Sequence, residues 1–213
     1  MVRPLILILV GVVSTPQEAA LNLEKRLYSL RSLEADFEQF YYSASISTPL
    51  QEKGKLFFQK PDSMRWEYKE PEKYVYLYRE GLSLAYFPED NQLFRYTLSP
   101  EEKDSDLFRL LLGKGKLEDV YFIEPASFPS ERHNPVQIKL IPKREGAFSY
   151  LLLEVDERTW FLQKLILFDG AGNKQEFRFS RVKLNPKLQP SLFELEVPPD
   201  CEVIEDAPPV KRL

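Results

Sequence analysis

The hydrophobic positions follow two different periods along the chain. Between Leu21 and Leu33, leucines recur at positions 23, 27, 30 and 33, with charged and polar residues between them. Spacings of three and four residues place these leucines on one face, so the segment predicts an amphipathic helix of about three turns. After this helix the period changes to two. Phe37, Gln39 and Tyr41 then share one side of an extended segment, which is typical of a β-strand.

Short strand-like segments continue almost to the C-terminus, separated by turns rich in Pro, Gly, Asp and Asn. A second short helix interrupts them at Asp104–Leu112, where Leu107, Leu110 and Leu111 form an apolar face. Because all connections are short, we expect one mainly β domain, built as a curved antiparallel sheet of about ten or eleven strands. The predicted strands after the first are Gly54–Gln59, Ser63–Tyr68, Tyr74–Arg79, Leu82–Phe87, Leu93–Leu98, Leu117–Ile123, Val136–Ile141, Phe148–Val155, Leu162–Phe168, Gln175–Leu184 and a final extended piece, Leu192–Val197.

The two ends of the chain differ from this pattern. Arg3 precedes the apolar run Leu5–Val13, which is too short to span a bilayer and is typical of a secretory signal peptide. We therefore expect residues 1–20 to be a signal peptide, cleaved after Ser14 or near Ala19 and Ala20; the alternative is an uncleaved N-terminal anchor. The domain then covers residues 21–204. Residues 205–213 are charged and contain prolines, so we expect a loose tail.

Composition favours a soluble protein and leaves its role open. The chain is 43% hydrophobic and 29% charged, and it contains 15 Phe, 11 Tyr and 2 Trp. Aromatic residues suit strands, and they also suit the walls of apolar pockets. The formal net charge is −4 and no basic stripe is present, so we expect no nucleic-acid partner.

No motif for catalysis or metal binding stands out. The chain has one Cys, Cys201, and one His, His133, which exclude an internal disulfide and make a poor metal site. No hydrolase elbow, phosphate-binding loop or zinc motif is present. We interpret Cys201 and His133 as bystanders, and we expect neither a cofactor, nor a metal, nor an enzymatic activity.

The strands predict a sheet with one apolar face. Met64, Trp66 and Tyr68 alternate with charged residues, so this strand buries one side and exposes the other. A wide curved sheet encloses a volume that either the protein's own side chains or a ligand can fill. The pattern leaves both possibilities open, and a long apolar ligand would suit a space that the two short helices only partly fill.

Four segments, taken in order, resemble the LolA family of periplasmic carriers of outer-membrane lipoproteins. The first helix runs into Ser32–Gln39, which is similar to the family's first strand. Gly54–Tyr68 is the strongest match, Tyr86–Gln92 is similar to a later turn, and Leu192–Leu195 followed by Pro198-Pro199 is similar to the closing strand. The resemblance covers most of residues 21–204.

This resemblance implies an unclosed β-barrel whose helices form a lid over an apolar cavity for the acyl chains of lipoproteins. It implies a soluble periplasmic protein, which we expect to be a monomer. Its partners would be an ATP-driven (ABC-type) release complex in the inner membrane and a lipoprotein receptor in the outer membrane. In the family an Arg holds the lid shut; here Lys60 occupies that position and offers a point charge instead of a planar fork. The family's Trp after the Gly81 turn is also missing, and Leu84 is the nearest residue.

We therefore predict a lipid-binding cavity, a lid formed by Leu107, Leu110 and Leu111, and a lid latch at Lys60. Two alternatives remain: a protein of the same fold that binds another lipid without protein cargo, and a structural or signalling protein with a filled core. The predicted cavity residues are Phe37, Phe57, Met64, Trp66, Leu84, Tyr86, Ile138, Leu152, Ile166 and Phe168.

Overall fold

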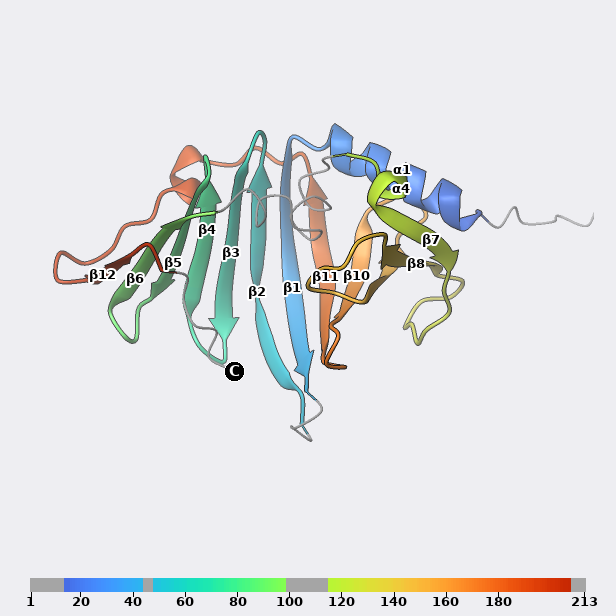
Figure 1. The fold of residues 1–213 in the computed structure, drawn as a ribbon. Helices are drawn as coiled ribbons and strands as arrows, with labels where there is room; N and C mark the ends of the chain where they lie inside the picture. The colour runs from blue at the N-terminus through green and yellow to red at the C-terminus, as the bar shows by residue number, and fades with distance from the viewer. Residues whose placement is uncertain (1–13, 44–47, 99–114, 208–213) are drawn as a thin grey trace, which may run out of the picture.

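A single twelve-stranded sheet dominates the computed structural model, which describes residues 14–43, 48–98 and 115–207 (Figure 1). The strand order is β12-β6-β5-β4-β3-β2-β1-β11-β10-β9-β8-β7. Neighbouring strands are antiparallel except β12, which runs parallel to β6. The sheet is unclosed, with β12 and β7 as its two edges, which confirms the predicted mainly β, unclosed architecture.

The elements in chain order agree closely with the predicted strands between residues 54 and 98. They are α1 (Pro16–Ser29), β1 (Ser32–Tyr42), β2 (Leu50–Gln59), β3 (Ser63–Glu70), β4 (Tyr74–Arg79), β5 (Leu82–Phe87), β6 (Gln92–Thr97), α4 (Leu117–Val120), β7 (Tyr121–Pro125), β8 (Val136–Pro142), β9 (Tyr150–Val155), β10 (Leu162–Phe168), β11 (Lys174–Leu184), the 3₁₀-helix η1 (Pro190–Phe193) and β12 (Glu202–Glu205).

Helix α1 begins earlier and ends earlier than the leucine pattern predicts. Thr15 and Glu18 form a capping box at its start, with Pro16 in the first turn, and the helix ends at Ser29. Leu33 therefore belongs to β1, not to the helix. Ala19 and Ala20 are buried in the core, so the predicted boundary at residue 20 cuts through α1.

Two other segments differ from their predicted structure. Leu117–Val120 forms the short helix α4, and only the residues that follow it form β7. The predicted closing strand Leu192–Val197 is not a strand, because η1 occupies its start. The last strand is instead β12, so the chain stays ordered within the sheet to Glu205, where we expected the loose tail to begin.

The register divides the sheet into two faces. The inner face carries Phe37 of β1, Leu56 of β2 and Trp66 of β3. Leu56 lies directly opposite Trp66, and Phe37 lies opposite Gly54, two residues before Leu56 on β2. Helix α1 packs on this face, and its Leu23 and Leu27 share one core with the inner-face residues of β8, β9 and β10. The outer face carries the alternate residues, such as Phe57 and Arg65.

A β-bulge gathers charged groups on the outer face of β1 and β11. The register slips so that Arg181 and Val182 lie opposite Ala35, and Arg181 has a φ of 48°. This bulge directs Arg181 to the carboxylate of Asp36, with which it forms an ion pair. The sheet thus keeps its inner face apolar while its outer face is solvated at this point.

We expect this charged group to make folding stability depend on acid. Lys183 lies 3.0 Å from Glu34 and lowers its pKa. Burial raises the pKa of Asp36, but hydrogen bonds from Lys55 and Arg181 outweigh it and lower that pKa overall. Depressed carboxylate pKa values contribute stability above the unfolded-state pKa of about 4, and this stability is lost as the pH falls through the folded-state values.

Urea unfolding at several pH values measures the effect. The midpoint should fall as the pH drops from about 5 toward 2, a range that brackets the ordinary carboxylate pKa values. In Asp36→Asn the urea midpoint at pH 7 should be lower than in the unchanged protein. The midpoint of this variant should also fall less as the pH drops. An unchanged acid dependence in this variant would show that the Asp36 pair contributes nothing to it.

Candidate functional site

Aromatic rings crowd the middle of the inner face. The ring of Phe37 lies 4.9 Å from the rings of both Trp66 and Tyr68, edge to face in each case. Trp66 also contacts Phe177 and Phe179 of β11, at 5.6 and 6.4 Å between ring centroids. Edge-to-face pairs at these distances are favourable beyond their burial alone. The inner face is therefore closely packed with aromatic rings at this point, and of these only Trp66 is more than slightly exposed.

Gly54 allows this arrangement. It lies on β2 between Phe37 and Tyr68, which are its partners on the two neighbouring strands. A Cβ atom at this position would come within 2.8 Å of the Phe37 ring and 2.1 Å of the Glu67 carbonyl oxygen. The missing side chain therefore lets the Phe37 ring lie across β2.

The inner face becomes aliphatic toward β8. Ile138, Leu140, Leu151, Leu153 and Leu165 are all at most 1% exposed there. Helix α1 covers this half, since among the described elements it packs against β7, β8 and α4. At the other half Trp66, Tyr74, Tyr76 and Tyr96 are only partly buried against the same core.

Polar side-chain contacts at several points hold α1 in place. Lys60, at the end of β2, donates a hydrogen bond to the Tyr28 carbonyl and lies 5.0 Å from the centre of the Tyr28 ring. Arg26 donates to the carbonyl of Thr159 at 2.5 Å. The Glu24 carboxylate accepts from the backbone N–H of Leu117. Burial lowers the pKa of Lys60 and raises the pKa of Glu24.

The predicted cavity residues are divided between the two faces. Phe37, Met64, Trp66 and Ile138 lie on the inner face, as their cross-strand partners establish. The other predicted cavity residues lie on the outer face and so do not share a face with Trp66, although all ten were expected to line one cavity; these are Phe57, Leu84, Tyr86, Leu152, Ile166 and Phe168. The predicted lid residues Leu107, Leu110 and Leu111 lie outside the described residues.

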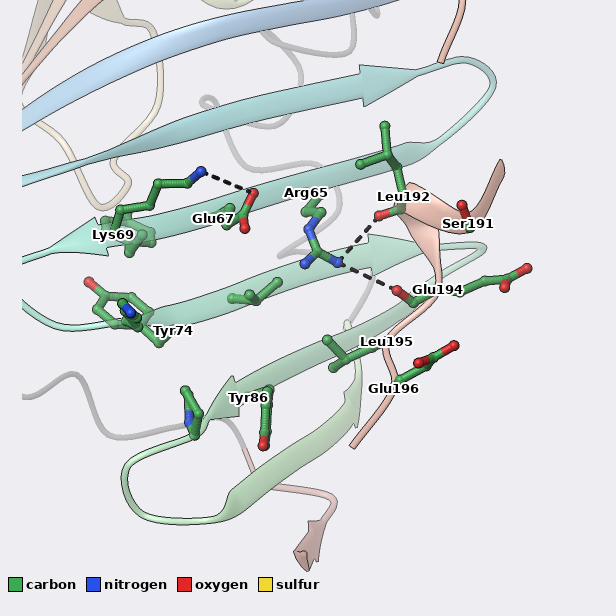
Figure 2. Close-up of a pocket in the computed structure, with 14 residues that line it drawn as sticks. Arg65, Glu67, Lys69, Tyr74, Tyr86, Ser191, Leu192, Glu194, Leu195 and Glu196 are labelled. Carbon is green, nitrogen blue, oxygen red and sulfur yellow. Dashed lines mark hydrogen bonds and ion pairs between the residues drawn. The ribbon is translucent and has the colours of Figure 1, made fainter. Parts of the chain in front are cut away.

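The C-terminal segment explains why the outer face is also apolar at β2, β4 and β5. Phe193 of η1 is buried against Phe57 and Leu77, in a second core separate from the inner one. Arg65 fixes this segment, because its guanidinium donates to the carbonyls of Leu192 at 3.3 Å and Glu194 at 3.4 Å (Figure 2). Because Leu192–Val197 was predicted to be a strand, this contact with Arg65 was not expected.

An outer groove remains beside the C-terminal segment. Its volume is about 710 Å³, and Figure 2 shows Tyr86 and Tyr74 on its strand side and Leu195 and Glu196 on the opposite side. Charges of both signs line it: Arg65 and Lys69 from β3, Lys73 from the β3–β4 turn, and three glutamates. Sequence reasoning placed Tyr86 in the inner cavity and missed this groove.

A second hollow lies on the inner face, at the end of β1 and β2 that is distant from α1. Its volume is about 410 Å³, and tyrosines from β3 and β4 form one wall. Within the described residues there is no group of three or more His, Cys, Asp or Glu side chains arranged to hold a metal ion. Nor does any helix in these ranges combine the length and the hydropathy needed to cross a bilayer.

Comparisons with known proteins agree with this geometry. Residues 28–196 match the family described as "Outer membrane lipoprotein carrier protein LolA". A Methylococcus capsulatus protein named "Outer-membrane lipoprotein carrier protein" is 31% identical over 195 residues, which cover 91% of this chain and 89% of that protein. A Coxiella burnetii protein with the same name is 22% identical over 202 residues, covering 92% of this chain and 90% of the relative.

Solved structures share the fold at low identity. An uncharacterized conserved protein from Thermus thermophilus matches with a TM-score of 0.58 and 13% identity, over 89% of this chain and 98% of that one. A chain of the Pseudomonas aeruginosa MucA/MucB complex matches with a TM-score of 0.52 and 12% identity, over 85% of this chain and 61% of that one. These likenesses concern the fold alone. The family match, in contrast, spans most of the sequence, and the chain belongs to the LolA family of outer membrane lipoprotein carrier proteins.

Proposed function

We propose that this protein carries lipoproteins by holding their acyl chains on the inner face of the sheet. The observation that carries the proposal is the aromatic cluster around Trp66, where Trp66 stays partly buried in the half of the inner face that α1 does not cover. Burial of each methylene group is worth about 0.8 kcal/mol, so acyl chains can bind here without a catalytic step. Family membership and the name of the Methylococcus capsulatus relative support this choice of ligand.

The direction of transport is part of the same proposal. The protein would receive lipoproteins from an ATP-driven release complex in the inner membrane and pass them to a receptor in the outer membrane. It would act in the periplasm after removal of an N-terminal signal peptide. Of the two predicted cleavage positions, the one after Ser14 leaves α1 and its capping box whole.

Ligand analysis tests the carrier role directly. The protein is produced with residues 1–20 in a bacterium with two membranes, isolated without detergent from the periplasm and examined by native mass spectrometry. We expect a bound acylated polypeptide. A bound small lipid without protein cargo would favour the alternative of a general lipid-binding protein, and a ligand-free protein that takes up no apolar dye would contradict both.

Lys60 is the proposed latch that keeps α1 closed when the protein is empty. Its hydrogen bond to Tyr28 exists only while the end of α1 lies beside Lys60. Removing it costs the closed state about 1 kcal/mol, because the pair is largely exposed. A ligand that binds the open state then gains affinity by about fivefold, and its release slows accordingly.

The variant Lys60→Leu measures this latch. Transfer of a fluorescent lipoprotein from the loaded carrier to lipid vesicles should slow by about fivefold relative to the unchanged protein. Lys60→Arg, which keeps the donor, should transfer at close to the original rate. Equal rates for Lys60→Leu and the original protein would remove the latch from the proposal and leave the inner-face site standing.

A further inference from the structure

The hollow at the distant end of the inner face has a chemistry unlike the rest of that face. Its lining comes from β1, β2, β3, β4 and β5, together with the β3–β4 turn and one residue of β11. The described residues of the aliphatic half present hydrocarbon side chains, whereas this hollow contains two carboxylates, Glu52 and Glu72. Gln39 and Gln175 add further polar groups. A purely apolar ligand would desolvate these groups without replacing their hydrogen bonds.

Aromatic rings form the other wall of the hollow. Tyr68 and Tyr74 stack with 4.2 Å between their centroids, and Tyr76 meets Tyr74 edge to face at 5.6 Å. Phe87 also stacks with Tyr74, at 5.4 Å. The electron-rich faces of such rings attract cations, and groups of them are a common means of holding an ammonium group.

The tyrosines remain neutral and keep one carboxylate in place. The Tyr74 hydroxyl donates to the carboxylate of Glu52, and the Tyr68 hydroxyl donates to the side-chain oxygen of Gln39. Burial raises the pKa of Tyr76 to about 12 and raises the pKa of Tyr68 as well. Since no Lys, Arg or His is among the described residues that line the hollow, its charge is negative and unopposed from within.

The hollow also continues the surface proposed for acyl chains. Tyr68 belongs to its wall and contacts the ring of Phe37 at the centre of the aromatic cluster. A ligand whose chains lie against Trp66, which is only partly buried, would bring its polar end toward Tyr68 and Tyr74. The expected ligand is an amphiphile that carries a positive charge at this end.

We propose that the hollow around Tyr68, Tyr74, Glu52 and Glu72 binds a primary ammonium group of the acylated ligand. The inference rests on the proposed function and adds that the protein prefers acylated molecules that carry a primary ammonium group. Two sources share this chemistry: the free α-amino group of a diacylglyceryl-cysteine lipopeptide, and the ethanolamine headgroup of a phospholipid. Anionic headgroups are disfavoured by the two carboxylates.

Four ligands distinguish these possibilities by calorimetry with the full-length mature chain. They are a diacylglyceryl-cysteine lipopeptide with a free α-amine, the same lipopeptide N-acetylated, and short-chain phosphatidylethanolamine and phosphatidylglycerol. We expect the free amine to bind about tenfold more tightly than its N-acetylated form. A larger preference between the two phospholipids than between the two lipopeptides would identify the phospholipid as the source.

Two variants assign the preference to the hollow. Glu52→Gln and Glu72→Gln, tested separately, should each reduce the preference for the free-amine lipopeptide over its N-acetylated form. In Glu52→Gln the two affinities should differ by no more than about twofold. Affinity for the N-acetylated lipopeptide should stay unchanged in both variants. Glu89→Gln removes the same charge from an exposed turn outside the hollow and should leave the preference intact. Equal affinity of the original protein for amine and N-acetylated ligands would overturn the ammonium site but not the carrier proposal. Failure of all four ligands to bind would overturn both.

Discussion

Gly54→Ala is expected to reduce the free energy of unfolding by about 3 kcal/mol, the upper part of the range for overpacked positions. The added Cβ would lie 2.1 Å from a backbone oxygen of β3 and 2.8 Å from the Phe37 ring. The backbone oxygen cannot move without separating β2 from β3, and Phe37 cannot move without disturbing the rings of Trp66 and Tyr68. Urea unfolding, followed by circular dichroism, measures the loss.

Gly170 provides the matched control for this substitution. A Cβ atom there would meet nothing within 4 Å, and the residue lies in the turn between β10 and β11. Gly170→Ala should therefore change stability by no more than about 0.5 kcal/mol. Similar midpoints for the two variants would show that the crowding of Phe37 over Gly54 is not a determinant of the fold.

Trp66→Asp is expected to weaken acyl-ligand binding by at least about 100-fold. The carboxylate would lie among the rings of Phe37, Phe177 and Phe179, where acyl chains would have to displace its water. A penalty of about 2.8 kcal/mol already corresponds to this loss of affinity. Fluorescence titration with a lipopeptide that carries a dansyl group measures the dissociation constant.

Phe122 is the control for this second substitution. Its side chain is 58% exposed on β7, and its register places it on the outer face. Phe122→Asp introduces the same charge and should keep the affinity within about threefold. Circular dichroism confirms that each variant is folded, and Tyr76→Asp offers a second inner-face position. Unchanged affinity in folded Trp66→Asp would contradict binding on the inner face.

For strands with one apolar and one charged side, the sequence also predicted which side chains point to the inner face. Met64, Trp66 and Tyr68 alternate with Arg65, Glu67 and Lys69, and the register confirms that the first three share the inner face. The same logic worked for Phe37, whose neighbours on β1 are charged. Local alternation decides the orientation of a strand when only one of its sides is buried.

Strands that are apolar on both sides gave the wrong face. Phe57 and Phe58 are adjacent and both are buried, one on each side of β2. What covers Phe57 is Phe193, which lies far away in the sequence. The local sequence pattern does not reveal that contact. Only the strand register in three dimensions therefore shows which side chains of β2 point to which face of the sheet.

For α1, too, the sequence predicted the element but not its end or its contacts. The leucine spacing predicted the helix and its buried face, but it extended the helix into β1, because Leu33 continues the spacing by coincidence. The bond from Lys60 to Tyr28 joins two elements whose proximity follows from the pairing of β1 with β2. The position of Lys60 was singled out by family resemblance alone.

Quenching of Trp66 by brominated acyl chains tests the central claim most directly. The chain has 2 Trp, so Trp160→Phe leaves Trp66 as the single fluorophore. A comparison protein carries Trp66→Phe, Trp160→Phe and Phe122→Trp, which moves the fluorophore to the outer face. With a lipopeptide brominated in its acyl chains, we expect strong, saturable quenching of Trp66 and little of the outer-face tryptophan. Quenching confined to the outer-face tryptophan, or equal for both, would contradict the account.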